Sequence, residues 1–300
     1  MLTLSYLSEL YLLHSNEYSK EVRRFELRGR YFPDPHKPNL MGVINLSSES
    51  WYRESVALDT SAAIRKVNIL QASGADIVDI GAESSLSYAQ RIDDIQQLEL
   101  LLPIIKEVST TSTLISVETY HLNVAKGCFK AGAAILNLTK GDNLKEFFKV
   151  VADYDGGVII NFVRGDNVRE VQPIELPNDP LSLLFPYFEK RVEEALSCGV
   201  RKIWLDPGLG FYYPNLLDGP TRIQRQMEIF LHTFRLRKFG WPICHALPHA
   251  FECFQDEVRT AEAFFAVLAI LGKTDLLRTH ELNKVLGVVK TMQLFSSKNP

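Results

Sequence analysis

Cysteine is scarce in this chain, with four residues among 300 and no CxxC pair. A small fold held together by disulfides carries many more cysteines for its length, so that class is excluded. Unpaired cysteines usually pack as small apolar side chains, and they stay reduced in a cytoplasm. We therefore expect a cytoplasmic location.

Long apolar runs and an excess of positive charge are also missing. No run of about 18 apolar residues occurs, so no membrane-spanning helix is expected. The amino terminus, MLTLSYLSELYLLHSNEYSK, lacks the basic start of a secretory signal. Lys and Arg number 33 against 36 Asp and Glu, a net charge of −3, which leaves no basic field to hold nucleic acid. Neither a membrane nor a nucleic acid is expected as a partner.

From Pro38 onward, short apolar runs alternate with longer amphipathic stretches. The runs predict buried strands at 39–45, 76–81, 114–118, 134–137, 157–162, 202–206, 241–246 and 275–278. Helical spacing follows them, for example at 60–73, 91–108, 123–131 and 181–198. Strands and helices that alternate in this way predict a parallel sheet covered by helices.

Eight strand–helix units of this size close most naturally into a (β/α)₈ TIM barrel, the α/β fold that we predict. An open doubly wound sheet is the alternative, but it usually has a glycine-rich turn after its first strand, and here that turn reads NLSSESWYRES. We divide the chain into a short N-terminal extension at 1–37 and the barrel at 38–300. Residues 23–32 alternate charged and bulky side chains, as expected for one strand with a solvent-exposed face. We expect the extension to pack across the bottom of the barrel.

Polar side chains follow nearly every predicted strand. They are Asn45, Asp79 with Glu83, Glu118, Asn137, Asn161 with Arg164, Asp206, His245, and Arg278 with His280. The carboxyl ends of barrel strands share one mouth, where the active sites of this fold lie. The pattern therefore predicts a site at that end.

Six ordered motifs resemble those of the dihydropteroate synthase family. MGVINLSSESWYRES is similar to the opening signature of that family, ADIVDIGAESS to its second, ISVETY to its third-strand motif, and LDPGLGF to its sixth. NFVRG and RTHE resemble the fifth- and eighth-strand motifs. The resemblance extends over about 41–295. It implies a barrel that condenses 6-hydroxymethyl-dihydropterin diphosphate with p-aminobenzoate and releases pyrophosphate with Mg²⁺.

The resemblance also implies roles for individual residues. Asp206, Asn137 and Glu118 would bind the pterin edge, with Glu118 standing where the family has Asp. Asn45 would hold Mg²⁺ near the diphosphate, and Arg278 with His280 would form the anion-binding pair. We add Asn161 and Arg164 of the NFVRG motif to the pterin-binding residues, and His249 to the catalytic residues.

The sequence departs from the family where anions should bind. Leu86 replaces an Arg of the second loop, and Arg53 replaces an Asp of the first. The Ser-Arg-Lys of the seventh strand becomes Leu247, Pro248 and His249. Because each lost cation can cost roughly 2–4 kcal/mol of transition-state stabilisation, these changes argue against ordinary condensation with p-aminobenzoate.

The sequence is consistent with three alternative functions. The first is a pterin transferase of the dihydropteroate synthase type. The second is a pterin- or folate-binding protein without turnover, acting as a partner or regulator of a true synthase. The third is a folate-dependent methyl carrier barrel, which would need a cobalamin partner; a DxHxxG-like cobalamin signature is missing from the sequence.

Two further expectations concern assembly and metal binding. Residues 261–272 (AEAFFAVLAILG) contain one charge, Glu262. A helix that is apolar all round needs cover on both sides, which predicts a homodimer, as does the family resemblance. Cys244, His245, His249 and Cys253 form a C-H-x3-H-x3-C pattern, but neighbouring strand residues such as Cys244 and His245 face opposite sides, which argues against a shared metal.

Overall fold

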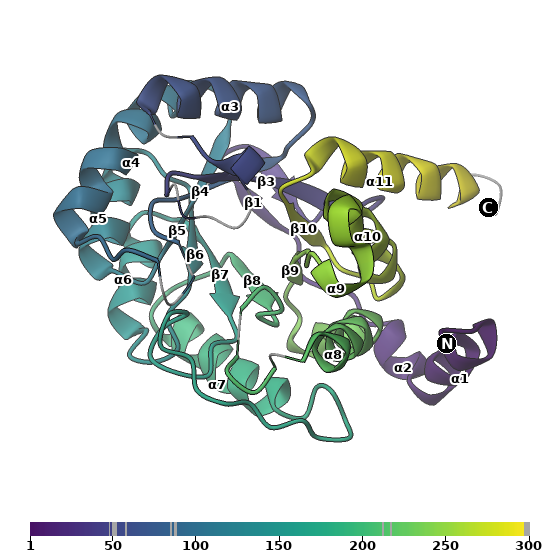
Figure 1. Ribbon diagram of the computed structural model, residues 1–300. Helices are drawn as coiled ribbons and strands as arrows, with labels where there is room; N and C mark the ends of the chain where they lie inside the picture. The colour runs from purple at the N-terminus through teal and green to yellow at the C-terminus, as the bar shows by residue number, and fades with distance from the viewer. Residues whose placement is uncertain are drawn as a thin grey trace.

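A computed structural model of the chain describes residues 1–47, 49, 53–57, 59–84, 86, 89–211, 213–216 and 218–296. Eight parallel strands form a central ring, and helices surround it (Figure 1). The strands are β3 (Asn39–Asn45), β4 (Ile77–Gly81), β5 (Leu114–Thr119), β6 (Ile135–Leu138), β7 (Gly157–Asn161), β8 (Ile203–Asp206), β9 (Cys244–Ala246) and β10 (Leu276–Thr279). Each lies where the sequence predicts a strand.

The hydrogen-bonded strand order runs from β8 back through β7, β6, β5 and β4 to β3, and then through β10 to β9. The two end strands meet at one parallel bridge between Leu205 and Ile243, where the N–H of Leu205 donates to the carbonyl of Pro242 (3.0 Å). This contact closes the ring. The barrel predicted from the sequence is confirmed, and the open doubly wound sheet is excluded.

The helices follow the strands along the chain. They are α3 (Thr60–Ala72), α4 (Asp94–Val108), α5 (Leu122–Ala131), α6 (Lys145–Asp153), α7 (Leu184–Ser197), α8 (Gly219–His232), α9 (Phe251–Phe254), α10 (Ala261–Leu271) and α11 (Leu282–Ser296), with short 3₁₀ turns η1 (Arg53–Ser55), η2 (Thr233–Phe239) and η3 (Gln255–Thr260). Among the described residues, none of the helices is both long enough and apolar enough to cross a membrane.

Helix α4 shows how local chemistry sets a boundary that periodicity misses. The pattern predicts a start at Arg91, but the helix begins at Asp94. The carboxylate of Asp93 accepts the N–H of Gln96, whose side chain in turn accepts the N–H of Asp93. This capping box satisfies two backbone donors at once and fixes the first turn.

The N-terminal extension contains α1 (Leu4–Leu13), α2 (Ser15–Tyr18), β1 (Phe25–Leu27) and β2 (Arg30–Phe32). The single strand expected at 23–32 is therefore an antiparallel hairpin. Arg28 and Gly29 between the two strands have φ of 49° and 81°. Two consecutive residues with positive φ make the tight turn that matches the twist of a hairpin. Alternation of side chains alone did not reveal this turn.

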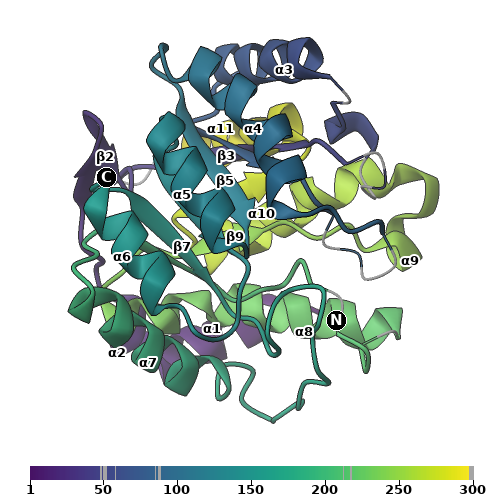
Figure 2. The ribbon, with the colours of Figure 1, turned by 90° about the vertical axis from the view of Figure 1, so that its left-hand side faces the viewer.

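The hairpin packs at the amino-terminal ends of the barrel strands. Phe25 and Phe32 meet the indole of Trp204 at ring-centroid distances of 4.8 and 5.5 Å. Arg28 donates to the carbonyls of Gly132 and Ala133, which precede β6. Figure 2 shows β2 at one end of the barrel and α9 at the other. The hairpin thus covers the end opposite the predicted site.

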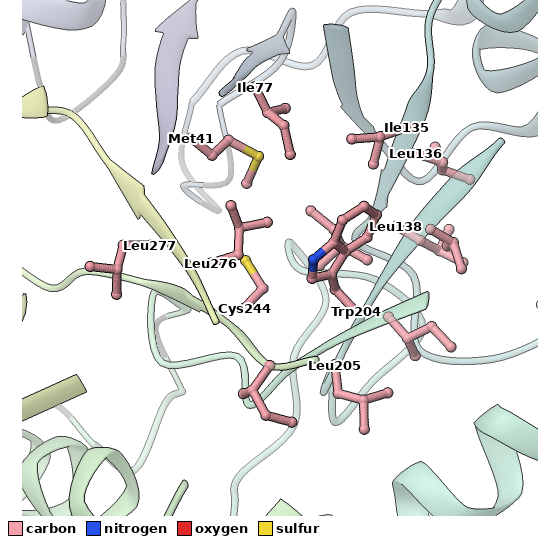
Figure 3. Packing of buried hydrophobic residues seen from close by; sticks show 14 of the residues in the cluster. Met41, Ile77, Ile135, Leu136, Leu138, Trp204, Leu205, Cys244, Leu276 and Leu277 are labelled. Carbon is pink, nitrogen blue, oxygen red and sulfur yellow. The ribbon is translucent and has the colours of Figure 1, made fainter. Parts of the chain in front are cut away.

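Trp204 fills the interior of the barrel. Its side chain is fully buried and lies at the centre of the ring, across from Met41, Leu276 and Cys244 (Figure 3). Gly157 of the neighbouring strand makes room for it, because a Cβ there would lie 2.8 Å from the indole. The interior is consequently a packed core below the mouth of the barrel.

Candidate functional site

A pocket of about 120 Å³ opens at the carboxyl ends of the barrel strands. The predicted site residues that line it are Asn45, Glu118, Asn137, Asn161, Asp206, His249, Arg278 and His280. They come from strands β3, β5, β6, β7, β8 and β10, from the residue just after β10, and from the loop after β9. The topology thus brings residues that are far apart in the sequence together at one end of the barrel.

Three residues named by the strand-end pattern do not line the pocket: Asp79 is fully buried behind it, and Arg164 and His245 lie elsewhere. Arg164 is exposed, and its Nε donates to the carbonyl of Pro173 (3.0 Å), in a separate open groove. His245 is buried, with Nε2 2.7 Å from Oγ1 of Thr233. Burial lowers the pKa of His245 to about 3. Its ring faces the helix layer, since it follows the inward-facing Cys244 in the strand.

Arg278 forms hydrogen bonds with two carboxylates at the bottom of the pocket, which we call the pocket floor. Its Nε donates to Oδ2 of Asp79 (2.8 Å), and its Nη2 donates to Oε2 of Glu118 (2.5 Å). Asn137 Nδ2 donates to the same Asp79 oxygen (3.0 Å). Asn161 Nδ2 then donates to Oδ1 of Asn137 (2.8 Å). One chain of hydrogen bonds therefore orients side chains from β4, β5, β6, β7 and β10.

The charges on this floor are unbalanced. Desolvation raises the pKa of Glu118, Arg278 opposes the rise, and the nearby Asp79 and Asp206 add to it. Burial works against the charge of Arg278, but Glu118 and Asp79 hold its pKa above the ordinary value. Three carboxyl groups thus share one guanidinium, an arrangement suited to a neutral ligand with N–H donors.

Asp206 is a buried carboxyl group at the end of β8. Its Oδ1 accepts the N–H of Gly208 (2.8 Å), and Cys244 is a second partner. Desolvation raises its pKa to about 6, against the opposing effects of Gly208 and Arg278. Gly208 has φ of +72°, and a Cβ there would lie 2.2 Å from the carbonyl oxygen of Phe162. Only glycine fits this turn, so the DPG sequence fixes the acid in the pocket.

Glu262 of α10 was missed as a site residue. It is fully buried, and its Oε1 lies 2.8 Å from Nδ1 of His280 and 3.4 Å from Nε2 of His249. Burial raises the pKa of Glu262, but the hydrogen bonds from His249 and His280 outweigh it and leave the pKa below the ordinary value. The signal available in the sequence was a single charge inside an otherwise apolar helix.

Two arginines shape the pocket without having been predicted as site residues. Arg222 of α8 lines the pocket, and its Nη2 donates to both carboxylate oxygens of Glu252 (2.6 and 2.7 Å). The buried Arg169 lies 3.2 Å from Glu83, which lines the pocket, and it also donates to the carbonyl of Ser84. Arg169 follows β7 and belongs to no motif, so spacing could not identify it.

Parts of two loops that the motif comparison used lie outside the described residues. These parts are Ser48, Ser50, Trp51 and Tyr52 of the first loop, and Ser85, Ser87 and Tyr88 of the second. Leu86 is described and lines the pocket, whereas Arg53 lies in η1 and is exposed.

Asn45 ends β3, and its Nδ2 donates to Oγ of Ser55 (2.6 Å). The oxygen of a side-chain amide, and not its NH2 group, is the atom that could serve as a metal ligand. An oxygen donor suits Mg²⁺.

Comparison with known proteins places this geometry in a family. Residues 41–280 match the profile of the family described as "Pterin binding enzyme". A dihydropteroate synthase of Streptococcus pyogenes is 28% identical over 208 residues, 68% of this chain and 72% of that protein. The folate synthesis bifunctional protein of Arabidopsis thaliana is 34% identical over 187 residues, 58% of this chain and 38% of that protein.

Solved structures share the fold. The dihydropteroate synthase of Xanthomonas albilineans with 4-aminobenzoic acid has a TM-score of 0.77 at 22% identity, covering 92% of this chain and 99% of that chain. The dihydropteroate synthase of Coxiella burnetii in complex with pteroic acid has a TM-score of 0.73 at 19% identity, covering 91% and 98%. The resemblance drawn from the motifs is confirmed, and the chain belongs to the dihydropteroate synthase family of pterin binding enzymes.

Proposed function

We propose that the pocket binds a pterin of the 6-hydroxymethyl-dihydropterin diphosphate type, and that condensation with p-aminobenzoate is slow or absent. The observation that carries the pterin assignment is the group of carboxylates on the pocket floor. Asp206 and Glu118 line the pocket, and Asp79 lies behind them, with Oδ1 buried and without a hydrogen-bond partner among the described residues. A buried acceptor of this kind calls for a donor from a ligand.

The chemistry of a pterin fits this floor. Its 2-amino-4-oxo edge presents several adjacent N–H donors beside a carbonyl acceptor. Carboxylates accept such donors in charge-assisted bonds worth roughly 1.5–3 kcal/mol each. Asn137 and Asn161 add amide groups that can donate or accept, and both are fixed by the hydrogen bonds described above. The pteroic acid in the Coxiella burnetii structure supports the same ligand class for this chain.

The diphosphate end is expected near Asn45, His249 and His280, which line the pocket. We propose that Asn45 holds Mg²⁺ through its amide oxygen, with phosphate oxygens and water completing the shell, as this ion prefers. Bound there, Mg²⁺ would neutralise negative charge on the diphosphate. Ser55 orients the amide for this role.

The cations of the pocket argue for slow condensation. Arg278 is engaged by Asp79 and Glu118, and Arg222 is engaged by Glu252. Both arginines therefore have internal partners that compete with an incoming anion. Leu247 and Pro248 line the wall where the family has Ser and Arg, and neither side chain can donate to a carboxylate.

The proposal is tested by measuring binding and turnover separately. Calorimetry with 6-hydroxymethyl-7,8-dihydropterin diphosphate and Mg²⁺ is expected to show one site per chain. Pyrophosphate release after p-aminobenzoate is added should be slower than that of the Streptococcus pyogenes relative assayed side by side, by a factor of about 10² or more. Absence of binding would remove the pterin assignment, and equal rates would show that condensation is intact.

We further propose that the protein is a cytoplasmic homodimer. All four cysteines are free, which supports a reducing location. Phe264 and Leu271 of α10 remain 40% and 41% exposed after the helix has packed on the barrel. Large apolar side chains that stay exposed on an apolar helix support a second protein surface over it.

A further inference from the structure

We propose that His249, Glu262 and His280 form a binding site for one divalent transition-metal ion in the wall of the pocket. The site uses none of the residues assigned above to the pterin edge, and the inference does not depend on which ligand the pocket takes. It is also separate from the Mg²⁺ proposed at Asn45.

The distances suit a small ion. One ligand atom from each residue can be chosen so that all three lie within 4.8 Å of one another. Oε1 of Glu262 is 2.8 Å from Nδ1 of His280 and 3.4 Å from Nε2 of His249. Bonds of about 2.0–2.2 Å in a tetrahedral shell place neighbouring ligand atoms about 3.4 Å apart. The three side chains therefore need only small shifts to enclose an ion.

Glu262 is held in place by its other oxygen. Oε2 accepts the hydroxyl of Thr279 and the backbone N–H groups of His280 (3.0 Å) and Glu281 (3.1 Å). These donors orient the carboxylate and favour its ionised form, which is the form that binds a metal. The ligands also come from three places in the fold: the loop before α9, helix α10 and the end of β10. Packing of these elements sets the geometry before any ion arrives.

The donor set indicates the class of metal. Two imidazole nitrogens and one carboxylate oxygen suit Zn²⁺ and similar transition metals, whereas Mg²⁺ and Ca²⁺ prefer oxygen donors throughout. Three protein ligands leave a fourth position open, as in catalytic zinc sites. His249 and His280 line the pocket and Glu262 lies behind them, so the open position would face the pocket.

An ion here would add positive charge that is not already paired with a carboxylate of the pocket. The two arginines that line the pocket, Arg278 and Arg222, are both paired with carboxylates. A water or an anionic oxygen of a bound ligand is the expected fourth ligand. The C-H-x3-H-x3-C pattern contributes only His249, because Cys244 is a partner of Asp206, His245 faces Thr233, and Cys253 is exposed.

The test uses full-length protein stripped with a chelator, re-equilibrated with Zn²⁺ and dialysed. Metal analysis by mass spectrometry is expected to find one Zn²⁺ per chain, and excess Mg²⁺ should not displace it. Co²⁺ in place of Zn²⁺ should give a visible absorption band. Glu262→Gln and His249→Ala should each weaken Zn²⁺ binding by about 100-fold or more. Loss of a residue that merely hydrogen-bonds to a metal ligand already lowers metal affinity by about 10–100-fold. Glu257→Gln and His36→Ala alter exposed residues and should bind as the wild type does.

If Glu262→Gln does not fold, as judged by circular dichroism, His249→Ala decides the question, because His249 lies in a loop. Wild-type protein without stoichiometric Zn²⁺ would overturn the proposal, as would unchanged binding by the variants. The cluster would then be a hydrogen-bonded support for His280. Calorimetry of the metal-free protein with a pterin tests the pterin pocket independently of the metal site. Failure of the metal proposal can therefore be distinguished from failure of the pterin proposal.

Discussion

Arg278 Nε lies 2.8 Å from Oδ2 of Asp79, a carboxylate with no exposed surface. The same guanidinium reaches Glu118, so β10 is joined through charged side chains to β4 and β5. Breaking a buried ion pair leaves an uncompensated charge, which costs more than the pair itself contributes. Arg278 is thus a structural residue as well as a candidate ligand for an anion.

Replacing Arg278 with Met should destabilise the fold by about 3–5 kcal/mol, because Asp79 would lose its only cationic partner among the described residues. Urea unfolding followed by circular dichroism measures this change. Arg91→Met is the matched control, because Arg91 pairs with Glu170 at the surface. Solvent screens such a pair, so it contributes little to the free energy of unfolding. A loss for Arg278→Met no larger than that of the control would show that the buried pair is not structural.

Asp206 should make stability depend on pH. Burial raises its pKa from 3.8 to about 6, so the folded state binds the proton more tightly than the unfolded state. The contribution of this group to stability is therefore present below pH about 4 and is lost as the pH rises to about 6. The shift of roughly two pKa units corresponds to about 3 kcal/mol.

Asp206→Asn removes this titration. The free energy of unfolding of the variant should rise relative to the wild type by about 3 kcal/mol between pH 4 and pH 7. Denaturant unfolding of both proteins at several pH values in this range gives the difference. A difference that stays constant with pH would mean that the carboxyl group does not titrate there.

The hairpin of the N-terminal extension should contribute strongly to stability. Phe32 is 1% exposed and packs on Trp204 in the barrel core. Its replacement by Ala should cost about 3–5 kcal/mol, whereas Tyr31→Ala on the same strand, 63% exposed, should cost far less. Thermal unfolding compares the two. Similar small losses for both would indicate that 1–37 packs only loosely on 38–300.

Light scattering tests the dimer. Two chains would give twice the 34.0 kDa of one, and Phe264→Glu, which places a charge on the exposed apolar face of α10, should halve the measured mass. A wild-type mass of 34.0 kDa at micromolar concentration would contradict the assembly.

Periodicity predicted the barrel because each strand and helix must bury one continuous apolar face, a local property of the sequence. The site was predictable where a residue ends a strand, as for Asn45 and Asp206. It was not predictable where a side chain joins the site only because whole elements pack together. Glu262 is such a residue, because it arrives from a helix of the outer layer. Arg164 was predicted to be a site residue and lies outside the pocket. It follows the buried Phe162 by two positions, beyond the end of β7, and its side chain is exposed.

A calorimetric comparison of two ligands shows whether the pocket recognises the 2-amino edge of a pterin. One is 6-hydroxymethylpterin, and the other is the same pteridine with oxygen in place of the 2-amino group. A carboxylate floor built around Asp206 should bind the pterin about 10-fold to 100-fold more tightly, because the second ligand loses a charge-assisted hydrogen bond. Asp206→Asn should weaken pterin binding and reduce this preference. Equal affinity of the wild type for both ligands, or no binding of either, would show that the pocket is not a pterin site.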